Sequence, residues 1–223
     1  DLAQLNDWRE IAVPAGETVC EILSVEPGAE RLRVHVGRGG RFELFAINAA
    51  GPYARAEAEV TLEEGAHFEF GGVTIGGGKN RQEFVTRTIH SSPGASSNQV
   101  VRSVQWGQAV GNFLGRIEVV KDAQKTDAAQ NFRAILLEKG ASANAKPELE
   151  IFADDVKCAH GAAIGALDET AGFYMASRGL PPEVARKLLI HAFVADALEA
   201  IEDEELRGEM LAKALNVLDE EAV

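Results

Sequence analysis

The chain has 223 residues, of which 46% are hydrophobic and 26% charged, and its formal net charge is −13. This composition is that of a globular protein large enough to fold without disulfide or metal support. The acidic excess argues against nucleic acid and anionic membranes as partners, and no apolar run approaches the ~20 residues of a membrane span.

The first residues and the two cysteines indicate the cellular compartment of the protein. The first residues lack the pattern of a signal peptide, and the chain begins with Asp1 rather than Met, so we expect an upstream segment. Cys20 and Cys158 are too few and too far apart for a disulfide framework. A reducing compartment, and therefore a cytoplasmic location, is the simpler expectation.

We expect an N-terminal segment over residues 1–12 and a β body over residues 13–166. Period-two alternation with Gly-rich breaks predicts the strands of this body; the clearest runs lie at 31–37, 53–65, 66–78 and 116–122. In the run 53–65 the apolar face begins with three alanines, which suits a narrow, tightly wound structure such as a β-helix or small barrel. The sequence contains no strict repeat, so periodicity does not indicate a solenoid.

Two segments of the β body contain residues that occur in enzyme motifs. "GGVTIGGGKN" (71–80) has Val73 and Asn80 where a phosphate-binding loop needs Gly and Ser or Thr, so it predicts a Gly-rich turn. "IHSSPGASSN" (89–98) has the residue types of a hydrolytic triad but lacks the G-x-S-x-G elbow, which favours a loop.

Cys158 and His160 form the most informative pair. "PELEIFADDVKCAHG" (147–161) is rich in strand formers, and on one strand these two side chains would share a face, with Asp154 possible beside them. Thiolate and imidazole suit iron, zinc and iron–sulfur centres, but a closed site takes about four ligands. Two readings stay open: a buried cysteine with a hydrogen-bonded histidine, or half of a metal site that a second chain completes.

Asp154 and Asp155 suggest an alternative, the paired carboxylates of a β-helical carbohydrate-active enzyme. Adjacent residues on a strand point to opposite faces, which argues against such a pair. A homomeric structural β protein without a site is a further alternative.

After residue 166 the pattern becomes helical, with expected helices over 167–179, 180–203 and 203–223. Asp168 is the expected N-cap and Gly179 the expected C-cap of the first. The stretch "LLIHAFV" (188–194) has a single polar residue, so either the core or a partner protein covers it on several sides. The scheme is α+β, mainly β, with a C-terminal helical subdomain over 167–223.

Residues 125–200 resemble the SufB/SufD core family of iron–sulfur cluster assembly proteins, and they are closest to its SufD branch. The resemblance rests on "TDAAQ" (126–130), "KPELEIFADDVKCAHGA" (146–162), "FY" (173–174) and "SRG" (177–179), which follow one another in the family's order. It implies a right-handed parallel β-helix with a C-terminal helical segment.

The resemblance also implies a function. It indicates a non-catalytic scaffold subunit that pairs with SufB and carries the ATPase SufC, with a homodimer possible in isolation. It assigns Cys158 and His160 as metal ligands shared with the partner chain, with no cofactor tightly bound to the isolated chain and a transient iron–sulfur cluster or iron in the complex. The residues it implies for partner binding are Phe173, Tyr174, Arg178, Gly179, Leu188 and Phe193.

Overall fold

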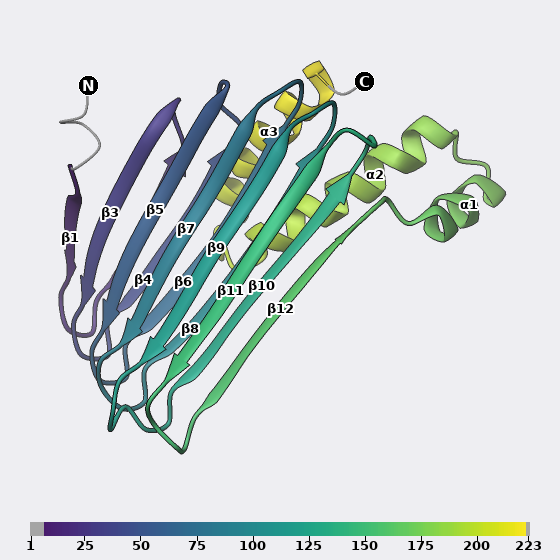
Figure 1. Cartoon of the computed structure of the whole chain (residues 1–223). Coiled ribbons are helices and arrows are strands. Elements are labelled where there is room, and N and C mark those ends of the chain that lie inside the picture. Colours follow the sequence, from purple (N-terminus) through teal and green to yellow (C-terminus); the bar gives the residue numbers. More distant parts are fainter. Residues whose placement is uncertain (1–6, 222–223) are drawn as a thin grey trace.

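The chain winds into a parallel β-solenoid with helices packed along one side (Figure 1). The computed structural model describes residues 7–221. Each coil gives one strand to each of two six-stranded sheets. Sheet A consists, in spatial order, of β1 (Arg9–Val13), β3 (Gly28–Val36), β5 (Tyr53–Leu62), β7 (Arg81–His90), β9 (Val110–Val119) and β11 (Ser142–Ile151). Sheet B consists of β2 (Thr18–Ser24), β4 (Arg41–Asn48), β6 (His67–Gly76), β8 (Ser96–Gln105), β10 (Asp127–Leu136) and β12 (Lys157–Gly165).

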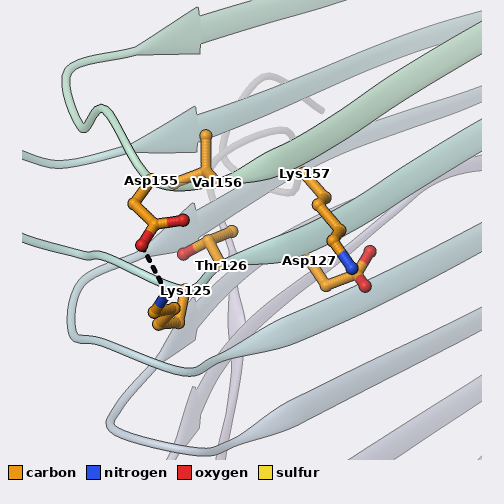
Figure 2. Close-up of a pocket in the computed structure, with 6 residues that line it drawn as sticks. All are labelled: Lys125, Thr126, Asp127, Asp155, Val156 and Lys157. Atoms are coloured by element: carbon orange, nitrogen blue, oxygen red, sulfur yellow. Dashed lines mark hydrogen bonds and ion pairs between the residues drawn. The ribbon is translucent and has the colours of Figure 1, made fainter.

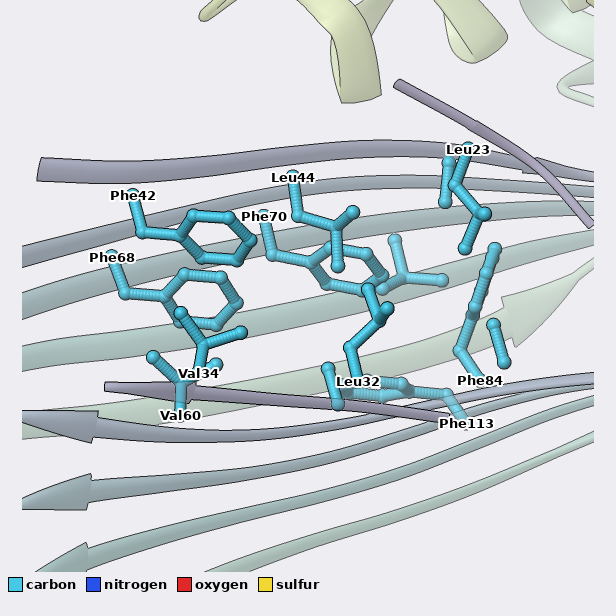
Figure 3. Packing of buried hydrophobic residues seen from close by; sticks show 14 of the residues in the cluster. Leu23, Leu32, Val34, Phe42, Leu44, Val60, Phe68, Phe70, Phe84 and Phe113 are labelled. Atoms are coloured by element: carbon cyan, nitrogen blue, oxygen red, sulfur yellow. The ribbon is translucent and has the colours of Figure 1, made fainter. Parts of the chain in front are cut away.

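Side chains of alternating strand residues fill the narrow space between the two sheets. Ala54, Ala56 and Ala58 are buried there, as their period-two spacing indicates. Opposite them, aromatic rings stack from coil to coil: Phe42 lies on Phe68 with ring centroids 5.8 Å apart (Figure 3). Small residues on one sheet thus make room for large ones on the other. The expected parallel β-helix with a C-terminal helical segment is confirmed, while its handedness stays a prediction.

Three α-helices and a short 3₁₀ segment follow the solenoid: α1 (Glu169–Ser177), α2 (Pro182–Ala195), η2 (Asp196–Leu198) and α3 (Glu204–Glu221). Apolar residues of α2, η2 and α3 form one cluster with outward-facing residues of β4, β6 and β8. α2, η2 and α3 therefore cover the outer face of sheet B over β4, β6 and β8. Gly71 on β6 permits this close approach, because a Cβ atom there would lie 2.1 Å from the carbonyl oxygen of Ala197.

An ion pair between a buried arginine and an exposed aspartate joins the helices to the solenoid. Arg102 on β8 is almost fully buried, and its Nε donates to Asp196 Oδ2 at 2.7 Å. The same guanidinium lies over the ring of Phe193. The helix expected over 180–203 is interrupted at this point: α2 ends at Ala195, and the chain turns through η2 so that Asp196 reaches Arg102 and Leu198 packs on sheet B.

The expected caps of α1 are largely as predicted. The Asp168 carboxylate accepts from the backbone N–H groups of Thr170 and Ala171. Arg178 is the C-cap residue, and Gly179 follows it with φ of 90°.

The expected division into residues 1–12, 13–166 and 167–223 stays a prediction. Residues 1–6 lie outside the described part, and β1 begins within the first segment and pairs with β3. Within residues 7–221, no helix is long and apolar enough to cross a bilayer.

His90, inside the solenoid, makes stability depend on pH. It is fully buried beside Ser97, and burial lowers its pKa from 6.5 to about 4. Because the unfolded chain takes up this proton first, stability is intact above pH 6.5 and is lost as the pH falls toward 4.

We expect His90→Gln to remove this part of the pH dependence. Between about pH 7.5 and about pH 5, the wild-type chain should lose roughly 2 kcal/mol more unfolding free energy than the variant. Urea unfolding at a series of pH values measures the difference. Equal losses in the two chains would contradict the assignment.

Candidate functional site

Cys158 and His160 lie on β12, the last strand of sheet B. Within the described chain β12 pairs with β10 alone, and its register places Cys158 beside Ala128 and His160 beside Gln130. Ala128 and Gln130 are buried inside the solenoid. Since adjacent in-register residues share a face, Cys158 and His160 point toward the same interior.

The pair is nevertheless accessible, because no further coil of the described chain stacks on β12. His160 is exposed, whereas Cys158 is half-buried against a small apolar cluster that includes Ala128, Ala153 and Val156. His160 is therefore not a core histidine. The two side chains line the open end of the solenoid, where a second polypeptide can reach them.

The surroundings of Cys158 favour the protonated thiol. Burial raises its pKa, and the nearby Asp127 carboxylate raises it further. The thiolate is the form that binds metals and acts as a nucleophile. The isolated chain therefore holds this cysteine in its less reactive form.

A turn anchored to the preceding coil positions β12 (Figure 2). The backbone N–H of Lys125 donates to the Asp155 carbonyl at 2.6 Å, and its ammonium pairs with the Asp155 carboxylate. Lys157 N–H donates to the Thr126 carbonyl at 2.8 Å. These residues, with Asp127 and Val156, line a cavity of about 230 Å³ at the start of β12.

The single strand expected over 147–161 is wrong. β11 ends at Ile151 and β12 begins at Lys157, because the chain must turn there from sheet A to sheet B. Asp154 and Asp155 lie in this turn, so Asp154 does not share a strand face with Cys158 and His160. Asp155 is engaged with Lys125. This pairing of Asp155 argues against a role for the two acids as the paired carboxylates of a glycosidase.

Cys158 and His160 alone would not complete a metal site. In the described residues no group of three or more His, Cys, Asp or Glu side chains is placed to hold a metal ion. Closed metal centres of thiolate and imidazole take about four ligands. Any iron bound here needs ligands from outside this part of the chain.

The residues expected to bind partners fall into two groups. Phe173 and Tyr174 on α1 and Leu188 on α2 are exposed, with Phe173 77% accessible. The Arg178 guanidinium lies 5.0 Å from the centre of the Tyr174 ring, next to Gly179. Phe193 differs, because it packs against Arg102 and the helix–sheet core.

Sequence patterns missed the groups that in-register stacking brings to the site. Asp127 and Gln130 belong to "TDAAQ", and aligning that strand under "KCAHG" would have placed them beside Lys157 and His160.

A second missed cluster lies on the outer face of sheet B. His67 Nδ1 lies 2.8 Å from Ser96 Oγ, and its Nε2 lies 3.1 Å from Glu69 Oε2. These are the residue types of a hydrolytic triad. The neighbouring cavity of about 240 Å³ is lined by Glu69 and Asn98 rather than by Ser96, so the hydroxyl does not face that space.

Comparison with known proteins points to one family. A family model described as SUF system FeS cluster assembly, SufBD core domain, matches residues 28–193. This match spans most of the solenoid, α1 and nearly all of α2, and it includes Cys158 and His160.

Named relatives agree with this match. An iron–sulfur cluster assembly SufBD family protein of Synechocystis sp. is 36% identical over 177 residues, which are 78% of this chain and 39% of the relative. The iron–sulfur cluster assembly protein SufD of Escherichia coli is 38% identical over 124 residues, which are 56% of this chain and 29% of the relative. A chloroplastic protein of Arabidopsis thaliana is 40% identical over 127 residues, or 56% of this chain and 26% of the relative. The chain thus spans less than half the length of these relatives.

The influence of Asp127 on Cys158 can be tested by thiol labelling. We expect Asp127→Asn to lower the Cys158 pKa and so to speed its alkylation at mildly alkaline pH by roughly two- to threefold, the effect of a surface interaction of about 0.5 kcal/mol. Iodoacetamide labelling read by peptide mass spectrometry gives the rate. Cys20 in the same chain is the control, and an unchanged Cys158 rate would refute the electrostatic role.

Proposed function

The chain belongs to the SufBD core family of the SUF iron–sulfur cluster assembly system, and on this basis we propose that it is a SufD-like scaffold subunit. In this proposal it pairs with a SufB chain, carries the SufC ATPase and is not itself an enzyme. Two features of the structure support the proposal: the free edge of β12 and the exposed apolar residues of α1 and α2.

The observation that carries the proposal is the coincidence of a free strand edge with half a ligand set. β12 has a partner on one side only within the described residues, and it bears Cys158 and His160. It contains few charges and many small residues, so it lacks the features that protect an exposed edge from pairing. A strand added beside β12 would lie about 4.8 Å away. Its side chains would then come within reach of the thiol and the imidazole.

Iron and the nascent cluster are cargo in this proposal. Cys158 and His160 supply two ligands, and the partner chain supplies the others. Because the surroundings of Cys158 favour the neutral thiol, we expect the isolated chain to hold no cluster tightly. Approach of a cation or of iron from the partner would favour the thiolate.

We propose that SufC docks on the exposed side of the helical subdomain. Phe173, Tyr174 and Leu188 expose large apolar surfaces, while the opposite side of α2 packs on sheet B. Arg178 lies beside this patch over Tyr174. We leave Phe193 out of the docking surface because it is half-buried against Arg102.

Two further points belong to the proposal. The free edge of β12 would also pair with a second copy of the chain, so a homodimer is compatible with it. The cysteines are free thiols, which fits a reducing compartment such as the cytoplasm.

The site is tested in a complex assembled from this chain, SufB and SufC. We expect His160→Ala to leave the complex intact but to reduce the cluster formed on anaerobic reconstitution with ferrous iron and sulfide by about tenfold or more. Visible absorption measures the yield. His35→Ala, an exposed histidine on sheet A, is the matched control. An unchanged yield in the His160 variant would rule out the site.

The docking surface is tested separately. We expect Leu188→Asp to release SufC during co-purification while SufB is retained, because a charge replaces an apolar contact. Leu114→Asp on sheet A is the control, since Leu114 and Leu188 are 38% and 45% exposed. Retention of SufC by the Leu188 variant, or its equal loss from both variants, would count against this surface.

A further inference from the structure

Gln130 lies directly inside the open end of the solenoid, in the coil beneath His160. Its side chain is only 2% exposed. It crosses the interior from sheet B to sheet A, where its Nε2 lies 3.3 Å from the Gly115 carbonyl and 3.4 Å from the Glu148 carbonyl. Gly115 leaves room for it, because a Cβ atom there would lie 2.1 Å from Gln130 Oε1.

The two backbone carbonyls determine which end of the Gln130 side-chain amide is Nε2 and which is Oε1. Carbonyl oxygens accept hydrogen bonds and cannot donate, so the group facing both of them must be the NH₂ of Gln130. The other end is therefore an acceptor, and Oε1 is buried without a partner. A buried acceptor without a partner costs free energy. A hydrogen-bond donor that reached Oε1 would therefore be stabilising.

His160 is the neighbour able to supply that donor. In sheet B, Gln130 is in register with Gln99 on one side and His160 on the other. The Gln99 amide accepts from Thr86 and donates to Thr88 of sheet A. Its second N–H does not reach Gln130 Oε1, which has no partner among the described residues. The His160 ring is exposed, shares the inward face with Gln130, and starts from a strand about 4.8 Å away.

We infer that Gln130 is a positioning residue for His160, with Gln130 Oε1 accepting the ring Nε2–H. The inference rests on the proposed function. Oε1 lies deep in the solenoid, close to Gly115 on the opposite sheet, so the distal ring nitrogen is the one that reaches it. A neutral imidazole carries a single N–H. Donation from Nε2 leaves the Nδ1 lone pair free for iron at the open end.

This arrangement suits a ligand whose ring must be oriented before the metal binds. Hydrogen bonds from metal-binding histidines to carbonyl or carboxylate groups fix the ring's tautomer and orientation. An amide does so without adding a charge next to Cys158. Gln130 would thus prepare His160 before a partner chain or iron arrives.

The test is ¹⁵N NMR of the histidine rings in the iron-free chain of residues 1–223. We expect Gln130→Met to lower the ratio of the Nε2–H to the Nδ1–H form of His160 by about fivefold, the effect of one hydrogen bond of ordinary strength. Gln99→Met is the matched control, because it removes a buried glutamine of the same column one coil deeper. It should leave the His160 ratio unchanged.

A second variant covers the case in which Gln130→Met does not fold. Gly115→Ala keeps the amide but displaces Oε1, and it should shift the ratio in the same direction. An unchanged ratio in the folded variants, or an equal change in Gln99→Met, would overturn the inference. Because this measurement uses neither iron nor a partner, its failure is distinct from a failure of the cluster assay.

Discussion

In-register stacking of parallel coils is the constraint on which the rest of this structure depends. Each residue of a strand lies beside the residue at the same position in the coils before and after it. Side chains therefore form columns that run from coil to coil. Neighbours in each column must pack against one another or form hydrogen bonds. The stack of Phe42 on Phe68, which are register partners on β4 and β6, satisfies this requirement in the apolar part of the interior. The glutamines at 99 and 130 do so in a polar column that ends at His160.

The same constraint explains why a free strand edge and an accessible pair of thiol and imidazole occur together. The backbone hydrogen bonds and side-chain contacts of a coil are complete only when another coil stacks on it. β12 is the last strand of sheet B in the described chain. Its backbone edge and its inward side chains are left open at the same place. Cys158 and His160 thus meet whatever covers the solenoid end. α2, η2 and α3 pack elsewhere, on the outer face of sheet B, where Asp196 pairs with Arg102 and Gly71 leaves room for Ala197.

Some features follow from local patterns and others do not. Alternation at residues 53–65 predicted a strand with alanines inside, and Asp168 predicted the start of α1, because both depend on neighbours in sequence. The strand expected over 147–161 and the helix expected over 180–203 were too long. In both cases a contact with a distant part of the chain, Asp155 with Lys125 and Asp196 with Arg102, marks the place where the chain turns.

The sequence alone predicts the strands of the body, the helical C-terminal segment and the spacing that puts a thiol and an imidazole on one strand face. It predicts these because backbone periodicity and capping act over a few residues. Three relations follow from the fold and not from the sequence: this pair lies at an open solenoid end, Asp127 acts on the thiol, and Gln130 lies beneath the imidazole. Those relations join residues that are far apart in sequence, and the register of the coils alone brings them together.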